Sequence, residues 1–324
     1  MDAVLTALVE DKIGPGEQTR LLIQIAREKI GFDYCIAFRS PVIALSIILK
    51  SLFPEQGQGL IISPLAPRYC LNVLDDLKIK PLYADVQPGS PYMSRESILK
   101  ALESKPDDLT VRAVLLHHSL GYVPNSLSLS DLDLPLIEDC SQSFPTVVTE
   151  KTSTYSIMGL EEKDIITAGG GALLYTFNRK DSSTLKEFDN LPPEYGLPDM
   201  NAAMGVIQLR EAKKSLERRG EIARVYTQAA LRTRHKRFPD EDYNNYAFPL
   251  ILETGLKDVK TYARRKDIIV ESAFENSIIA SGIIPFGLCP EAYSLSLRTV
   301  LFPLYPRLRQ EEIEKVSKLI ASLP

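Results

Sequence analysis

Three polar side chains near the middle of the chain have the types and spacing that could support chemistry. Asp139 ends an apolar run that begins at Leu134, and Gln142 follows three residues later. Such a run is typical of a buried parallel strand whose carboxyl end delivers polar groups into a crevice. Lys163 precedes the three glycines at 169–171 and a second apolar run, so we expect it on a turn between two elements rather than on a helix face.

A strand-end carboxylate and a turn lysine are the two groups that a pyridoxal phosphate enzyme needs. The lysine forms a Schiff base with the cofactor, and the carboxylate pairs with the pyridinium nitrogen so that the ring can accept electrons. We therefore expect Lys163 to be the catalytic nucleophile and Asp139 to bind the ring. Two structural alternatives stay open, because Asp139 could cap a following turn and Lys163 could be a solvated loop lysine among acidic neighbours.

At these residues the chain resembles the DegT/StrS family of pyridoxal-phosphate-dependent sugar aminotransferases. The sequence E-D-C-S-Q at 138–142 fits the family's E-D-x-x-Q, and K-D-I-I-T-A-G-G-G at 163–171 keeps the family's spacing from lysine to glycine, with Gly169 where the family has glutamate. Weaker matches follow in the family's order at 40–45, 118–121, 200–209 and 301–306. The resemblance implies a type I pyridoxal-phosphate transferase fold, and it implies that Gln142 binds the ring hydroxyl.

The expected phosphate-binding residues differ from the family pattern. The family's S-G-T-x-A-L at a helix start is S-P-V-I-A-L here, so Pro41 and Val42 remove one N–H and one hydroxyl while Ser40 remains. The family's serine five residues before the lysine falls on Met158, and Ser156 stands two residues earlier. We expect Ser40 and Ser156 to bind the cofactor, and we expect pyridoxal 5'-phosphate to be held weakly or lost.

Alternating strand and helix patterns position these groups in the first part of the chain. Strands are expected at 34–38, 59–63, 80–84, 111–117 and 134–139, and helices at 16–29, 40–51, 67–77 and 94–102. Ser40 and Pro41 open a helix as its N-cap and first-turn residue, and a helix start that follows a strand attracts phosphate. The alternation predicts an α/β three-layer sandwich with a mixed, mostly parallel sheet.

The second part of the chain predicts a smaller C-terminal domain. The polar, proline-rich stretch 180–198 indicates a loop, and 199–231 indicates one long helix that bridges two domains. An α+β pattern then follows, with strands expected at 246–252 and 267–270 and helices at 256–266 and 309–323. We place a large domain at 1–236 and a small α+β domain at 237–324.

Composition favours a soluble globular protein that acts on small molecules. The 324 residues are 44% hydrophobic and 25% charged, which allows a substantial core. The net charge of -4 comes without long runs of one sign, and this argues against nucleic acid and membrane partners. No signal peptide or membrane span is expected. The 4 cysteines are widely spaced, which favours reduced core thiols and the cytoplasm, and the 3 histidines make a metal site improbable.

The function that the resemblance implies is transfer of an amino group from an amino acid such as glutamate to a keto sugar on a nucleotide, as in surface-polysaccharide or amino-sugar biosynthesis. Retention of the lysine disfavours the family's dehydratase branch, which has histidine there. The alternative is a degenerate, inactive homologue that acts as a ligand-binding or interaction protein, which the altered phosphate-binding residues favour. The resemblance also implies a homodimer, with the loop at 191–198 reaching across to the partner.

Overall fold

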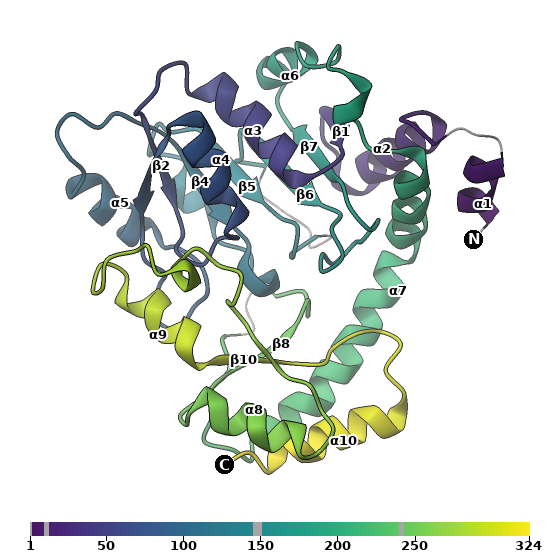
Figure 1. Ribbon diagram of the computed structural model, residues 1–324, viewed down its shortest axis with the longest axis vertical. Helices are drawn as coiled ribbons and strands as arrows, with labels where there is room; N and C mark the ends of the chain where they lie inside the picture. Colours follow the sequence, from purple (N-terminus) through teal and green to yellow (C-terminus); the bar gives the residue numbers. More distant parts are fainter. Residues whose placement is uncertain (1, 10–12, 145–150, 240–242) are drawn as a thin grey trace.

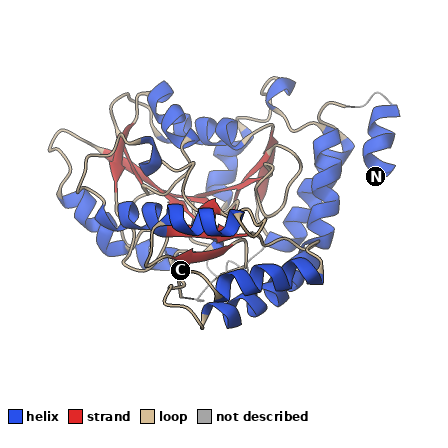
Figure 2. Cartoon of the chain, turned by 60° about the horizontal axis from the view of Figure 1, so that its bottom comes forward, coloured by secondary structure: helices blue, strands red, loops and turns tan. Residues whose placement is uncertain are grey.

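A seven-stranded sheet forms the centre of the larger part of the molecule, with helices on both sides (Figures 1 and 2). The computed structural model describes residues 2–9, 13–144, 151–239 and 243–324. The strands are β1 (Tyr34–Phe38), β2 (Gly59–Ile62), β3 (Lys80–Tyr83), β4 (Val111–His117), β5 (Leu136–Asp139), β6 (Tyr155–Gly159) and β7 (Ala172–Thr176).

Their order in the sheet is β1-β7-β6-β5-β4-β2-β3. Strand β7 is antiparallel to both of its neighbours, and every other neighbouring pair is parallel. The expected three-layer α/β architecture with a mixed, mostly parallel sheet is therefore confirmed.

Two groups of helices cover the two faces of this sheet. Helices α3 (Pro41–Leu52) and α4 (Tyr69–Leu77) pack on one face, together with α6 (Arg179–Lys186). The other face is covered by α2 (Glu17–Ile30), α5 (Arg95–Glu103) and the first half of α7 (Asp199–Ala230). Ser40 caps α3 as expected, because its side chain accepts a hydrogen bond from the Ile43 N–H at 3.4 Å.

The carboxyl ends of the parallel strands meet at one edge of the sheet. His117 ends β4, Asp139 ends β5, and these two residues are register partners. Gly159 ends the next strand, β6. Ligands of open α/β sheets bind at this edge, and the start of α3 lies at the same edge because β1 leads directly into it.

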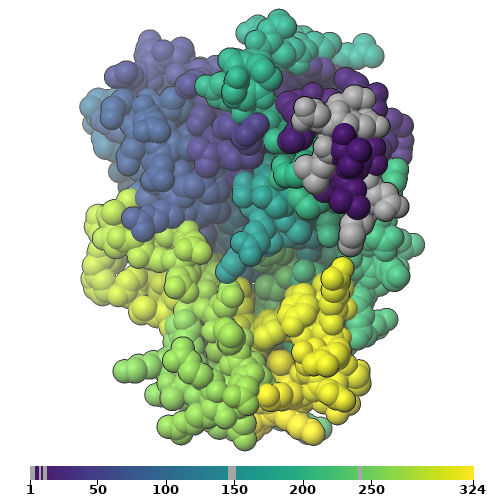
Figure 3. All heavy atoms as spheres, turned by 45° about the vertical axis from the view of Figure 1, so that its right-hand side comes forward, coloured from purple at the N-terminus to yellow at the C-terminus, as the bar shows by residue number. Residues whose placement is uncertain are grey.

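A second, antiparallel sheet lies in the C-terminal region. Its strands are β8 (Phe248–Ile251), β9 (Glu271–Ser272) and β10 (Thr299–Phe302), in the order β8-β10-β9. It shares a core with the end of α7, α8 (Leu256–Arg264) and α10 (Gln310–Ala321). Helix α7 runs from the large sheet to this lobe in Figure 1, and Figure 3 shows the lobe below a hollow in the surface. A boundary at 236/237 stays a prediction.

Further short elements complete the described chain. They are α1 (Asp2–Val9), α9 (Pro290–Arg298) and the 3-10 turns η1 (Ser119–Gly121), η2 (Ser126–Leu129), η3 (Pro193–Tyr195) and η4 (Ile279–Ser281).

Two local expectations are wrong. The stretch 180–198 is not all loop, because Asn178 caps α6 by accepting from Lys180 N at 2.7 Å, and Leu185 anchors this helix in the core. The stretch 267–270 forms no strand, because Asp267 has a left-handed φ of 52° and β9 begins only at Glu271. A side-chain cap decided the first outcome, whereas in the second the main-chain bonds from Asp267 N to Arg264 O and from Ile268 N to Ala263 O continue the turn at the end of α8.

Candidate functional site

A buried carboxylate at the end of β5 is the centre of the candidate site. Asp139 Oδ2 lies 2.9 Å from His117 Nδ1, and its Oδ1 accepts hydrogen bonds from the N–H and the hydroxyl of Ser141 at 3.1 Å and 2.5 Å. Asp139 and His117 are both buried. These three contacts fix the carboxylate at the end of β5.

These contacts keep Asp139 ionised although it is out of water. Burial by itself raises the pKa of a carboxyl group, but the proximity and hydrogen bond of His117 and the two bonds from Ser141 hold the pKa of Asp139 below its ordinary value. A buried carboxylate that stays ionised is suited to hold a protonated nitrogen next to it.

Gln142 lies in the turn that follows Asp139. Its Oε1 accepts a hydrogen bond from Leu120 N at 2.7 Å. Leu120 has a left-handed φ of 59°, which is costly for a leucine, so this bond helps to hold the turn after β4. The side chain of Gln142 therefore joins two strand-end turns, and its NH₂ group is the part left for other contacts.

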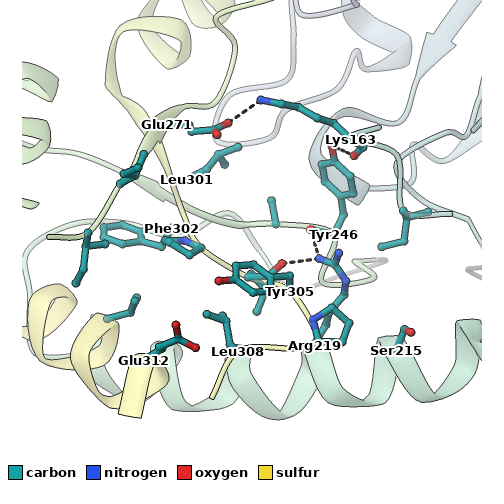
Figure 4. A pocket seen from close by; sticks show the side chains of 18 of the residues that line it. Lys163, Ser215, Arg219, Tyr246, Glu271, Leu301, Phe302, Tyr305, Leu308 and Glu312 are labelled. Atoms are coloured by element: carbon teal, nitrogen blue, oxygen red, sulfur yellow. Dashed lines mark hydrogen bonds and ion pairs between the residues drawn. The ribbon is translucent and has the colours of Figure 1, made fainter. Parts of the chain in front are cut away.

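Lys163 projects away from the Asp139 cluster. Its ammonium makes an ion pair with Glu271 of the C-terminal lobe at 3.0 Å, and the two side chains are 68% and 56% exposed. Its main-chain carbonyl accepts a hydrogen bond from the Tyr246 hydroxyl at 2.7 Å. Figure 4 shows the lysine reaching toward Glu271 across the top of a cavity. The structure thus does not bring the Lys163 amine and the Asp139 carboxylate together.

Asp164, the next residue, is the loop side chain that lies near Asp139. Its Oδ2 accepts from Glu161 N at 2.8 Å. Both this oxygen and the Ser141 hydroxyl lie against Gly159, where a side chain would overlap them. Removal from water raises the pKa of Asp164 to about 8, and the charge of Asp139 contributes. The loop therefore adds a second carboxyl group, protonated near neutral pH, to the cluster.

Tyr69 at the start of α4 faces the same cluster. Burial raises the pKa of its phenol, and the nearby carboxylates of Asp139 and Asp164 raise it further. Because Tyr69 and Cys70 both lie close to Asp139, the carboxylate shares the sheet face that α3 and α4 cover. The N-cap Ser40 belongs to this face as well.

Ser156 lies on the opposite face. Its neighbour Ile157 packs in the core under α3, and successive strand residues point to opposite sides. The Ser156 hydroxyl is buried and lies 2.8 Å from that of Ser153. The expectation that Ser40 and Ser156 share one binding site is therefore corrected: the pleat of β6 separates Ser156 from Ser40 and Asp139.

A cavity of about 950 Å³ lies between the Lys163 loop, α7 and the C-terminal lobe (Figure 4). Lys163, Asp164 and Tyr246 line it on one side, and Tyr305 lines it on another. Across it, Arg219 of α7 donates from Nη1 to the carbonyls of Tyr246 and Leu304, both at 2.7 Å. Asp139 is not among the described residues that line this cavity, so Asp164 is the residue that connects it to the buried cluster.

Sequence reasoning missed the place of two of these residues in the site, namely Asp164 and Tyr246. Asp164 adjoins Lys163, and a polar residue beside a turn lysine was the available signal for it. Tyr246 carried no such signal, because it is far from Lys163 in the sequence.

Comparison with known proteins identifies the family. A sequence model of the DegT/DnrJ/EryC1/StrS aminotransferase family matches residues 1–321. The chain belongs to this family. The family that the sequence resembles is thereby confirmed.

Individual relatives of this DegT-family chain are distant. An uncharacterised protein of Methanocaldococcus jannaschii is 22% identical over 70% of the chain and 66% of its own length. GDP-perosamine synthase of Vibrio cholerae is 25% identical over 57% of the chain and 54% of its own length. The matched region thus spans less than two thirds of each. The crystal structure of a DegT-family aminotransferase from Brucella abortus has a TM-score of 0.86 at 18% identity, over 98% of this chain and 93% of that one.

The described residues fit the pyridine half of pyridoxal phosphate. Asp139 is ionised, buried and oriented by His117 and Ser141, as a ring-nitrogen partner must be. The capped start of α3 suits an anion. The amine fits less directly, because Lys163 must leave Glu271 before it can bond a cofactor beside Asp139.

No group of three or more His, Cys, Asp or Glu side chains among the described residues could hold a metal ion. In the described part of the chain, no helix has the length and apolar content that crossing a membrane requires.

Proposed function

We propose that this protein is a pyridoxal-phosphate-dependent aminotransferase that transfers an amino group from an amino acid to a keto sugar carried on a nucleotide. Membership of the aminotransferase family supports this, and so does the likeness to a GDP-perosamine synthase. The single observation that carries the proposal is the ionised Asp139, fixed by His117 and Ser141 at the carboxyl edge of the sheet.

Each residue of the site has a proposed role. When bound, pyridoxal phosphate supplies an electron sink for the carbon that carries the amine. Asp139 pairs with the ring nitrogen and keeps it protonated, and Gln142 offers its NH₂ group to the ring hydroxyl. Ser40, with the N–H groups at the start of α3, holds the phosphate. We assign no phosphate contact to Ser156.

Lys163 is the proposed site of cofactor attachment and of proton transfer. Its Nζ must be neutral to act as a nucleophile or base, and a free lysine has a pKa of about 10.4. The ion pair with Glu271 favours the charged ammonium. Release from Glu271 and removal from water both favour the neutral amine, and the charge of Asp139 opposes this unless the ring nitrogen pairs with it. An exposed pair of this kind contributes only about 0–1 kcal/mol, so its release is easy.

A second candidate function is a degenerate homologue that keeps the fold without transamination. The outward position of Lys163 favours it, and so do Pro41 and Val42 at the start of α3. Pro41 has no N–H and Val42 has no hydroxyl to offer an anion, so this helix start has fewer phosphate ligands than the family pattern.

Cofactor attachment separates the two candidates. Purified protein would be mixed with pyridoxal phosphate, its spectrum recorded, and the bond trapped with borohydride for peptide mapping. The proposed enzyme turns yellow and carries the mass label on Lys163, and Lys163→Ala does neither. A colourless, unlabelled wild-type protein would instead support the degenerate homologue.

We propose that the protein works as a cytoplasmic homodimer. The proline-rich loop at 191–198 is held beside the start of α3, because Arg39 N donates to Tyr195 O at 2.8 Å and Leu197 N donates to Ala37 O at 3.2 Å. It thus lies next to the proposed phosphate site, where a partner could complete it. All four cysteines are buried free thiols, which suits a reducing compartment.

A further inference from the structure

The segment 244–246 of the C-terminal lobe contacts both turns of the candidate site. Asn244 Nδ2 donates to the main-chain carbonyl of Gln142 at 2.9 Å. Asn244 N donates to Gly121 O at 3.4 Å, and a side chain at Gly121 would overlap Asn244. The segment is therefore fitted closely against the turns that follow β4 and β5.

Tyr246 extends this contact to the Lys163 loop. Its hydroxyl donates to Lys163 O at 2.7 Å, its N–H donates to the Asn244 side chain at 2.9 Å, and its carbonyl accepts from Arg219 Nη1 at 2.7 Å. The tyrosine is thus fixed at its N–H, its carbonyl and its hydroxyl. Figure 4 shows the ring standing between Arg219 and the main chain of Lys163.

The C-terminal lobe thereby contacts Lys163 at two points of different strength. Glu271 contacts the ammonium, and both of these side chains are mostly exposed to water. Tyr246 contacts the main-chain carbonyl from a half-buried position. The first contact joins two long, mostly exposed side chains, whereas the second joins main chain to a tyrosine that is also bonded at its N–H and its carbonyl. The main chain can therefore stay in place while the side chain turns.

We propose that Tyr246 is a positioning residue that anchors the main chain of Lys163 while its side chain moves from Glu271 to the cofactor. This inference rests on the proposed attachment of pyridoxal phosphate to Lys163. A fixed Cα limits the directions open to the amine, and reactions gain rate when the reacting group is held near its productive position. Tyr246 does this without touching the reacting atoms.

The test compares Tyr246→Phe with Tyr262→Phe. The first removes the hydroxyl that bonds Lys163, and the second removes a hydroxyl 3.0 Å from Ser322 Oγ in the same lobe, remote from the site. The measurements are the rate and pH profile of cofactor attachment, hydrogen exchange of peptides covering 160–168 in cofactor-free protein, and the urea midpoint.

We expect Tyr246→Phe to slow attachment roughly two- to tenfold, as one lost hydrogen bond predicts. It should also shift the pH profile of attachment and speed exchange at 160–168. Tyr262→Phe should leave the rate of attachment, its pH profile and the exchange at 160–168 unchanged. The contrary result for Tyr246→Phe is a lower urea midpoint with the wild-type pH profile of attachment and the wild-type exchange at 160–168. That result would show that Tyr246 has a structural role only, and it would overturn the inference. If the wild-type protein takes up no cofactor, the proposed function fails. The exchange experiment needs no cofactor, so unchanged exchange at 160–168 in Tyr246→Phe would still refute the anchoring role of Tyr246.

Discussion

His117 and Asp139 end neighbouring parallel strands as register partners, and their side chains form a buried pair with 2.9 Å between Nδ1 and Oδ2. The pair lowers the pKa of Asp139 in the folded protein. The stability that the ionised Asp139 contributes is therefore fully present above its unfolded-state pKa of about 3.9, and it is lost as pH falls through the lower folded-state pKa. The site carboxylate should therefore remain ionised throughout the neutral range.

Asp139→Ala should abolish transamination and leave the fold intact. The ring nitrogen loses the carboxylate that keeps it protonated, and His117 loses its partner at a cost of about 1–3 kcal/mol. Amino transfer to a keto-sugar substrate and the circular dichroism spectrum would be measured on the same preparation. Wild-type activity in this variant would disprove the role of the strand-end carboxylate.

Lys163→Ala should remove covalent cofactor attachment with little loss of stability. The Lys163–Glu271 pair is exposed, so its loss should lower the free energy of unfolding by no more than about 1 kcal/mol. Glu271→Gln is the matched control, since it breaks the same pair but keeps the amine and should still turn yellow. Attachment that persists in Lys163→Ala would assign the bond to another lysine.

The wild-type protein should lose pyridoxal phosphate on dialysis, because the start of α3 offers few phosphate ligands. Each lost hydrogen bond to a charged phosphate is worth roughly 1.5–3 kcal/mol. Pro41→Gly combined with Val42→Thr restores one N–H and one hydroxyl and should tighten binding. Titration calorimetry of both proteins tests this, and cofactor that survives exhaustive dialysis of the wild-type protein would refute it.

Asp164→Asn should make stability less dependent on pH. Removal from water raises the folded-state pKa of Asp164 to about 8 from 3.8, so the folded protein keeps a proton that the unfolded chain has released. The stability from this proton is complete below the unfolded-state pKa and is lost as pH rises toward the folded-state value, with a slope of ~1.4 kcal/mol per pH unit. Urea unfolding between about pH 5 and about pH 8 should favour the variant increasingly as pH rises. A constant difference would mean that Asp164 is ionised throughout.

The homodimer should appear in sedimentation velocity at working concentration. If the loop at 191–198 reaches the partner's site, dilution to monomer should also weaken cofactor binding, because each site would lose contacts from the other chain. A monomer that binds cofactor with unchanged affinity would contradict the proposal.

The sequence by itself determined the sheet and the place of its polar edge. Strands β1 and β4 begin and end at the residues expected, and Asp139 is the last residue of β5. These apolar runs lose the most contact with water when they form strands of a sheet that is covered on both faces. Ser40 was likewise predictable as the cap of α3, since its hydroxyl satisfies an N–H only a few residues away. These features depend on local sequence.

Only the tertiary structure decided how the Lys163 loop is arranged. Lys163 and Asp164 are adjacent and both polar, so the pattern of polar and apolar residues does not distinguish them. In the structure Asp164 turns toward Asp139, and Lys163 turns toward Glu271. Contacts with Ser141 and Tyr246 settle this choice, and both residues are distant in the sequence. The pleat of β6 likewise separates Ser156 from Ser40. Such outcomes follow from packing between segments, which local composition does not encode.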